Sequence, residues 1–233
     1  MERFPAGFEE HEAGSHVELV AYTDRAGEAE IRAAFAQATS EPVAGGWEDR
    51  WKEFHRPVRA GGIWIGPPWI APPAGELAVV VDPGRAFGTG AHPTTRACID
   101  LLAGLERGSL LDAGCGSGVV AVAAARLGFA PVRAVDLDDV AVEVTAEAAR
   151  TNGVELEVAH VDVLRDEIPD ADVVVANIEL TVVEALLDRS PARVAVTSGY
   201  LAAERPYAQV WIHVQRIELD GWAADVFSRA ALS

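Results

Sequence analysis

Cysteines, positive charges and long apolar runs are all scarce in this sequence of 233 residues, and each shortage excludes a class of protein. The two cysteines, Cys98 and Cys115, are too few for a disulfide framework, and their spacing does not match a metal site. No stretch reaches the roughly 18 consecutive apolar residues of a membrane helix, and the first residues show no signal-peptide pattern. We therefore expect a soluble protein of the cytoplasm that binds no metal.

Positive side chains are outnumbered almost two to one, with 19 Lys and Arg against 36 Asp and Glu, so the formal net charge is −17. A surface this negative repels phosphate backbones and anionic lipids, so direct binding to nucleic acid or to membranes is not expected. The charge would attract a basic partner, although it also favours solubility alone. Because 50% of the residues are hydrophobic, the chain can form the core of one medium-sized globular protein, and we expect a monomer.

Composition divides the chain into three parts. Residues 1–57 are acidic and predict one strand at 16–22 and one helix at 27–38, a small α+β segment. Residues 58–76 are rich in proline, glycine and tryptophan, which predicts an extended connector rather than core sheet. Residues 77–233 alternate short apolar runs with helical patterns, as parallel βαβ units do.

The third part predicts a mostly parallel, doubly wound α/β sheet with right-handed crossovers. Its expected strands lie at 77–81, 109–112, 132–136, 156–160, 172–176, 194–198, 211–217 and 223–228. Its expected helices lie at 93–105, 119–127, 140–151 and 181–187. The last two strands have no helix between them, which indicates an antiparallel hairpin at the edge of the sheet.

A glycine-rich loop follows the strand expected at 109–112 and reads Asp112-Ala-Gly-Cys-Gly-Ser-Gly118. Its glycines let the backbone turn sharply and approach a ligand closely, while the start of the next helix supplies amide donors. In sheets of this kind, ligands bind at the carboxyl ends of the strands near the point where the strand order reverses. The loop therefore predicts a ligand site.

Two ligands fit the loop. The register from Gly116 to Ala121 satisfies the G-x-G-x-x-A spacing of a dinucleotide site, and Asp136 would accept the ribose hydroxyls, so spacing does not exclude NAD. A carboxylate at Asp112 opposes a pyrophosphate, however, and suits the ammonium and sulfonium of S-adenosyl-L-methionine. Asp136 serves either ligand as a ribose acceptor.

Three further acidic residues lie close to the expected strand ends. Asp138 and Asp139 are expected at a helix start, where the helix dipole favours negative charge. Asp162 is either a recognition residue for an adenine ring or a solvated carboxylate in a loop.

A second motif sharpens the interpretation. The run from Asp82 reads Asp-Pro-Gly-Arg-Ala-Phe-Gly-Thr-Gly-Ala-His-Pro-Thr-Thr95. Together with the glycine loop and Val-Val-Ala-Asn-Ile at 174–178, it resembles the PrmA family, the bacterial methyltransferases of large-subunit ribosomal protein eleven. The similarity extends from about Trp47 to the end of the chain.

The resemblance implies a Rossmann-like class I methyltransferase fold and S-adenosyl-L-methionine as the cofactor. It also implies methyl transfer to lysine side-chain and α-amino groups of ribosomal protein eleven, with trimethylation. The cofactor-binding residues that it implies are Phe87, Gly88, Thr89, Thr95, Asp112, Gly114, Gly116, Gly118, Asp136, Leu137, Asp162 and Asn177. Asn177 is also the implied catalytic residue, because its side chain or the adjacent carbonyls would accept hydrogen bonds from the incoming amine.

No dedicated general base is evident. His92 could act as one, but a structural hydrogen bond at a helix start is the favoured interpretation. Cys115 is expected to be a packing residue, since methyl transfer needs no thiolate.

Two departures from the family pattern concern the substrate. Residues 1–57 have room for about half of the family's ferredoxin-like recognition domain, so we expect a reduced recognition segment. Glu179 follows Asn-Ile where the family has small and apolar residues; it either faces solvent at a helix start or accepts a cationic amine. Three alternatives therefore stay open: a methyltransferase for another amine or a small molecule, an inactive cofactor-binding interaction protein, and an NAD-dependent oxidoreductase.

Overall fold

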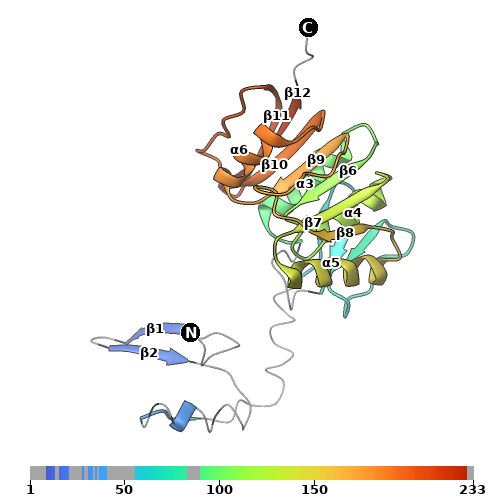
Figure 1. The fold of residues 1–233 in the computed structure, drawn as a ribbon. Helices are drawn as coiled ribbons and strands as arrows, with labels where there is room; N and C mark the ends of the chain where they lie inside the picture. The colour runs from blue at the N-terminus through green and yellow to red at the C-terminus, as the bar shows by residue number, and fades with distance from the viewer. Residues whose placement is uncertain are drawn as a thin grey trace. The chain divides into compact units, whose positions relative to one another are not determined.

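The computed structural model describes residues 9–13, 16–20, 28, 31–33, 35, 37–40, 56–82 and 90–229. The chain divides into two compact units, Met1–Arg50 and Trp51–Ser233 (Figure 1). None of the helices in the described ranges has the length and apolar character needed to cross a membrane.

The first unit contains an antiparallel hairpin of β1 (Glu9–Ala13) and β2 (His16–Val20). Strand β2 confirms the described part of the strand expected at 16–22, whereas β1 was not expected. Residues 31–33 are helical, within the helix expected at 27–38.

The second unit is built on a seven-stranded sheet with the order β11-β12-β10-β9-β6-β7-β8. Its strands are β6 (Leu110–Ala113), β7 (Val132–Asp136), β8 (Glu157–His160), β9 (Val173–Asn177), β10 (Val194–Leu201), β11 (Trp211–Leu219) and β12 (Trp222–Arg229). The strands from β8 to β10 run parallel, and β12 runs antiparallel to both β10 and β11. The doubly wound sheet with its antiparallel edge hairpin is thus confirmed.

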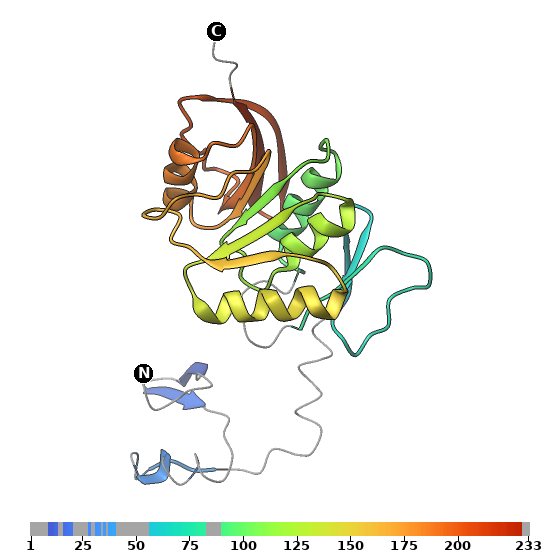
Figure 2. The ribbon, with the colours of Figure 1, turned by 45° about the vertical axis from the view of Figure 1, so that its right-hand side comes forward.

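Four helices cover the two faces of this sheet: α3 (Pro93–Ala103), α4 (Val119–Leu127), α5 (Asp139–Asn152) and α6 (Leu180–Arg189). Helices α3, α4 and α5 pack on one face, and the orange α6 packs on the other (Figure 2). A hydrophobic core lies on each face of the sheet. The sequence of strand β9 is apolar because its residues enter both cores: Val173 and Val175 enter the core beneath α3 and α4, and Val174 and Ala176 the core beneath α6.

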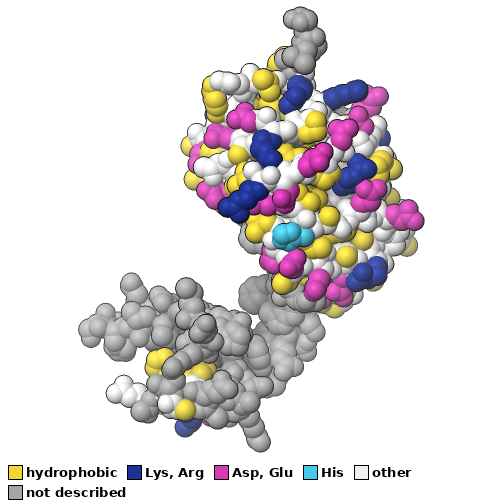
Figure 3. Space-filling model, viewed as in Figure 1, with side chains coloured by type: hydrophobic (Ala, Val, Ile, Leu, Met, Phe, Trp, Pro, Cys, Tyr) yellow, Lys and Arg dark blue, Asp and Glu magenta, His cyan; other side chains and the backbone are white. Residues whose placement is uncertain are grey.

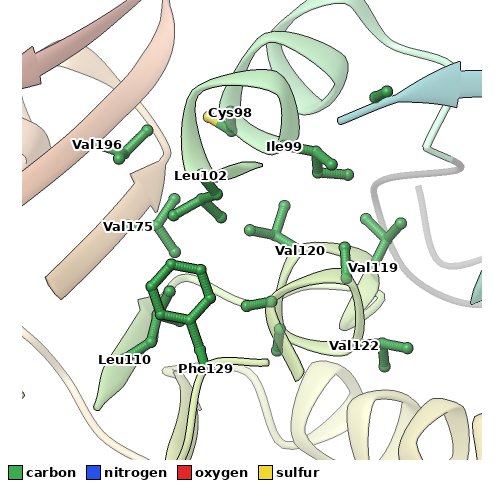
Figure 4. Packing of buried hydrophobic residues seen from close by; sticks show 14 of the residues in the cluster. Cys98, Ile99, Leu102, Leu110, Val119, Val120, Val122, Phe129, Val175 and Val196 are labelled. Atoms are coloured by element: carbon green, nitrogen blue, oxygen red, sulfur yellow. The ribbon is translucent and has the colours of Figure 1, made fainter. Parts of the chain in front are cut away.

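The larger core lies between α3, α4 and the sheet. Leu102 of α3, Val120 of α4 and Val175 of β9 converge there, together with Phe129 from the segment after α4 (Figure 4). All four side chains are at most 5% exposed. Helices α3 and α4 both begin at the carboxyl edge of the sheet.

The expectation of a purely extended connector at 58–76 is corrected for its first part. There, β3 (Val58–Ala60) and β4 (Ile63–Gly66) form a hairpin, and β5 (Ala78–Val80) pairs with β4 in a separate three-stranded sheet. The strand expected at 77–81 therefore does not join the large sheet. The prolines flank the hairpin at 57 and 67 without entering it, and so they do not prevent strand pairing.

Acidic and basic side chains are mixed on the face of the molecule shown in Figure 3. The coloured side chains form no large patch of one sign on this face. The net charge of −17 is therefore not concentrated there, and it identifies no docking surface on this side.

Candidate functional site

A cavity of about 540 Å³ lies where β6, β7 and β9 end. It is close to the point between β6 and β9 where the strand order reverses, which is the usual ligand position in such sheets. Two groups of residues line it. The β6–β8 side consists of Asp112, Gly114–Val120 without Gly118, Asp136, Leu137, Val161 and Val163. The β9–β12 side, which includes the start of α3, consists of His92, Thr94, Thr95, Asn177, Ile178, Glu179, Val182, Gly199 and Trp222.

The glycine loop on the β6–β8 side has the backbone that its sequence predicts. Gly114, Gly116 and Gly118 have φ angles of +79°, +52° and +77°, which disfavour side-chain-bearing residues. A Cβ atom at Gly114 would lie 2.4 Å from Cγ2 of Ile178. The loop crosses the end of β7, where the Val135 carbonyl accepts hydrogen bonds from the Gly114 and Cys115 amides at 2.8 and 3.0 Å.

Asp112 presents a buried carboxyl group to the cavity. It is 2% exposed, and its Oδ2 has no hydrogen-bond partner among the residues that the structure describes. Burial raises the pKa of Asp112 to about 7, the Ala121 amide opposes this rise, and the nearby Asp136 adds to it. An unsatisfied buried acceptor costs about 1–3 kcal/mol. The ammonium of S-adenosyl-L-methionine would satisfy it, so the residues present fit this cofactor.

Asp136, at the end of β7, holds the loop in place. Its Oδ2 accepts a hydrogen bond from the Gly116 amide at 3.0 Å, and its Oδ1 accepts one from the Asp138 amide at 3.1 Å. Each carboxylate oxygen can accept a second hydrogen bond, so both remain able to bind ribose hydroxyls. The next residue, Leu137, lines the cavity with 69% of its surface exposed, an apolar area that a flat ring could cover.

The acidic residues expected at a helix start are found there. Asp138 caps α5 by accepting a hydrogen bond from the Val140 amide at 2.9 Å, and Asp139 lies in the first turn. Both side chains therefore stabilise the helix end that carries Asp136 and Leu137 into the cavity.

Two expected cofactor residues, Asp162 and Gly118, do not line this cavity. Asp162 does not line it: its Oδ1 accepts a hydrogen bond from the Leu164 amide at 2.9 Å, and its carboxylate lies 3.4 Å from Arg165. Its neighbours Val161 and Val163 line the cavity instead. Three more expected cofactor residues, Phe87, Gly88 and Thr89, lie outside the described residues.

Asn177, the last residue of β9, enters the cavity from the β9–β12 side. Its Nδ2 donates a hydrogen bond to Oγ1 of Thr95 at 3.3 Å, and Thr95 is 1% exposed. The amide is thereby oriented, and its Oδ1 is left to accept a hydrogen bond from a ligand. The structure thus joins two expected residues that are 82 positions apart in the sequence.

The backbone beside Asn177 is fixed by β10. The Ile178 amide donates a hydrogen bond to the Ser198 carbonyl at 3.1 Å, and Gly199 follows at a bulge in β10 with a φ of +101°. A Cβ atom at Gly199 would lie 2.1 Å from the Ile178 carbonyl oxygen. Only glycine permits this close approach.

The structural interpretations of His92 and Cys115 are confirmed. His92 caps α3, where its Nδ1 accepts from the Thr94 amide at 3.4 Å and lies 2.7 Å from Oγ1 of Thr94. Burial raises the pKa of Cys115 to about 12, and Oγ1 of Thr145 donates to its sulfur at 3.2 Å, so the group stays a thiol. Glu179 precedes α6 as its N-terminal cap residue and is exposed.

The residues of the β9–β12 side that the sequence analysis missed include Gly199 and Trp222. Trp222 is the first residue of β12, and its ring contacts the His92 ring in a T-shaped arrangement with 5.0 Å between centroids. No local pattern marks either position. In the described ranges, no group of three or more His, Cys, Asp or Glu side chains could hold a metal ion.

Comparison with known proteins gives a consistent result. The family described as ribosomal protein L11 methyltransferase (PrmA) matches residues 8–227. A ribosomal protein L11 methyltransferase of Symbiobacterium thermophilum is 39% identical over 194 residues, which cover 76% of this chain and 64% of that protein. One from Legionella pneumophila is 35% identical over 200 residues, covering 78% and 68%. The chain thus spans less than two thirds of the length of the Symbiobacterium protein.

A solved structure shares the fold. The crystal structure of a ribosomal protein L11 methylase from Lactobacillus delbrueckii subsp. bulgaricus superposes with a TM-score of 0.64 at 26% identity. The superposition covers 72% of this chain and 95% of that one.

Proposed function

Because the chain belongs to the PrmA family of ribosomal protein L11 methyltransferases, we propose that it transfers methyl groups from S-adenosyl-L-methionine to amines of ribosomal protein L11. The acceptors would be lysine side-chain and α-amino groups. The observation that carries the proposal is the buried carboxyl group of Asp112, whose Oδ2 has no hydrogen-bond partner in the described part of the chain. It lies in the same cavity as the glycine loop and Asn177, so one cavity offers both a cation partner for the cofactor and an acceptor for an amine.

The β6–β8 side would hold the cofactor. Asp112 would pair with its ammonium, and Gly114, Gly116 and Gly118 would allow the loop to approach it closely. Asp136 would accept the ribose hydroxyls, and Leu137 would cover the adenine ring.

Further contacts to the cofactor complete the proposal. Phe87, Gly88 and Thr89 would cover the cofactor together with Thr95. When bound, the cofactor supplies a methyl group on a positively charged sulfur, which is already a strong electrophile.

The β9–β12 side would orient the amine. Thr95 fixes the Asn177 amide, whose Oδ1 would accept a hydrogen bond from the amine and direct the nitrogen lone pair into the cavity. A lysine amine has an ordinary pKa of about 10.4, and it reacts only when neutral. Removal from water into this partly apolar cavity favours the neutral form. Since Nδ1 of His92 is engaged by Thr94, no side chain is assigned as the base.

We propose a basic protein substrate that is attracted at long range by the net charge of −17, with no part for nucleic acid. Residues 1–57 are proposed as the segment that recognises this substrate, residues 58–76 as its connection, and residues 77–233 as the methyltransferase domain. The hairpin β3–β4 packs into the core of the second unit and would couple the connection to that domain.

The test is mass spectrometry of purified ribosomal protein L11 after incubation with this protein and S-adenosyl-L-methionine. We expect mass increments of one to three methyl groups on amines. Asn177→Ala should lower kcat about tenfold or more and change cofactor affinity less than about threefold. Methylation of other amines but not of L11 would contradict the substrate, and tight cofactor binding without any turnover would contradict the activity.

A further inference from the structure

An aromatic wall closes part of the β9–β12 side. Trp222 lines the cavity and contacts His92 with 5.0 Å between ring centroids and an interplanar angle of 69°. A T-shaped contact covers at most one face of an indole, so His92 does not cover both faces of Trp222. The hydrogen bonds of His92 to Thr94 fix one ring of the pair, and strand pairing of Trp222 with Leu201 fixes the backbone of the other.

The lining of the cavity carries negative charge alone. Its carboxyl groups are Asp112 and Asp136 on the β6–β8 side and Glu179 on the β9–β12 side, and none of the described residues that line it is Lys or Arg. The first two have roles toward the cofactor, whereas Glu179 and Trp222 have none so far. An indole face and a carboxylate together attract a cation.

We propose that Trp222 and Glu179 form a recognition site for the cationic acceptor amine and select its methylated forms for further methylation. This inference rests on the proposed amine methylation. In each transfer the nitrogen lone pair forms a bond to the methyl carbon, and the carbon–sulfur bond breaks with its electron pair left on sulfur. The positive charge passes to nitrogen, which releases a proton to water before the next transfer.

Each added methyl group changes which partners hold the amine. The nitrogen loses an N–H donor, so its hydrogen bond to Asn177 weakens, but its charge and its apolar surface remain. Cation–π attraction is strongest for Trp and does not require N–H groups. Trp222 therefore retains partly methylated amines in the site, and Glu179 attracts the free ammonium at the entrance.

The first test compares Trp222→Leu, Trp222→Phe and the matched control Trp211→Leu. Trp211 lies in the same hairpin but does not line the cavity. With ribosomal protein L11 or its amine-bearing peptide, Trp222→Leu should raise KM about fivefold and shift products from trimethyl toward monomethyl by about the same factor. Trp222→Phe should recover part of the wild-type KM and part of the wild-type product ratio. Trp211→Leu should leave the product ratio unchanged. Thermal unfolding and S-adenosylhomocysteine affinity report whether each variant is folded.

The second test measures binding rather than turnover. Calorimetry with S-adenosylhomocysteine present compares a trimethyllysine peptide with its neutral isostere, in which carbon replaces the nitrogen. The wild type should bind the cationic peptide about fivefold more tightly than the neutral one, and Trp222→Leu should reduce this preference. Glu179→Gln should lower the affinity for the cationic peptide at low salt and leave the affinity for the neutral peptide unchanged.

The outcomes separate this inference from the proposed function. Equal affinity of the wild type for the two peptides overturns the cation site even if L11 is methylated. An unchanged product ratio in Trp222→Leu overturns its role in repeated methylation. A wild type that methylates no amine overturns the proposed function, whereas a charge preference that depends on Trp222 would still support the cation site.

Discussion

On the β6–β8 side of the cavity, one continuous run, Asp112–Gly118, supplies both the buried carboxyl group and the loop. On the β9–β12 side, the start of α3, the end of β9, the bulge of β10 and the start of β12 each contribute separate residues. The first side depends on backbone conformation that glycine allows, and the second depends on strands and helices meeting correctly. Substitutions should therefore act locally on the first side and through neighbours on the second.

Gly199→Ala should have the largest effect and tests this contrast directly. The new Cβ atom would lie 2.1 Å from the Ile178 carbonyl oxygen, at a φ of +101° that other residues rarely adopt. Ile178 must shift, and Asn177 shifts with it. We expect kcat to fall about 100-fold, because a displacement of about 1 Å can cost that much. Calorimetry should show a change in cofactor affinity of less than about fivefold.

Gly153→Ala is the matched control for Gly199→Ala. Gly153 also has a positive φ, +59°, but a Cβ atom there meets nothing within 4 Å. It should lose about 1 kcal/mol of stability and keep its turnover. If Gly199→Ala retains turnover within about threefold, the contact with Ile178 does not position Asn177.

Asp112→Asn should have the next largest effect, on the β6–β8 side. At about pH 8 it should lower the affinity for S-adenosyl-L-methionine about 30-fold, or about 2 kcal/mol, because the ammonium loses its charged partner. Burial raises the pKa of Asp112 to about 7, so wild-type affinity should fall as the pH drops below that value. Calorimetry across this range should find the Asn variant independent of pH, and a parallel fall in both proteins would contradict the assignment.

The same substitution, Asp112→Asn, should stabilise the folded protein although it weakens cofactor binding. Between the ordinary aspartate pKa of about 3.9 and the folded value, the folded protein binds more protons than the unfolded chain. Its free energy of unfolding therefore falls as pH rises through that window and levels off above it. Without cofactor at about pH 8, Asp112→Asn should be more stable than the wild type by on the order of 2 kcal/mol in urea unfolding. An equal or lower stability would mean that burial of the Asp112 carboxylate does not destabilise the folded protein.

The contrast between the two sides also explains what sequence could predict. The central strands of the large sheet, such as β6 and β9, follow from apolar runs, because burial on both faces leaves a local signal. The hairpin β3–β4 was missed because the prolines at 57, 67 and 68 suggested a connector, although they flank the strands. Local composition does not show which side of a proline a strand occupies.

The site shows the same limit. The glycine loop and Asp136 were predictable because their spacing is local. Trp222 reaches the cavity only because β12 runs antiparallel to β10, which brings its first residue to the carboxyl edge of the parallel strands. Gly199 is required only because Ile178 passes close to it. Neither relation exists before the sheet is assembled.

Asp136→Ala should have a moderate effect that separates two roles of one side chain. It removes the proposed ribose acceptor and the hydrogen bonds to the Gly116 and Asp138 amides. Cofactor affinity should fall about tenfold, or about 1.4 kcal/mol, in calorimetry. Asp138→Ala is its control: it removes the cap of α5 and should cost about 1 kcal/mol of stability with little change in affinity. Equal losses of affinity in the two variants would show that helix capping, rather than ribose binding, matters.

Cys115→Ala should have the smallest effect, although Cys115 lies inside the glycine loop. Oγ1 of Thr145 hydrogen-bonds to both the Cys115 sulfur and the Gly116 carbonyl, at 3.2 and 3.1 Å, so the second contact still holds the loop in the variant. Cofactor affinity and kcat should change less than about twofold, with a loss of about 1 kcal/mol of stability from the small cavity. Because burial raises the thiol pKa to about 12, iodoacetamide near neutral pH should not inactivate the wild type. Rapid inactivation that Cys115→Ala abolishes would show instead that the loop opens and exposes the thiol, and then the β6–β8 side would not be preformed.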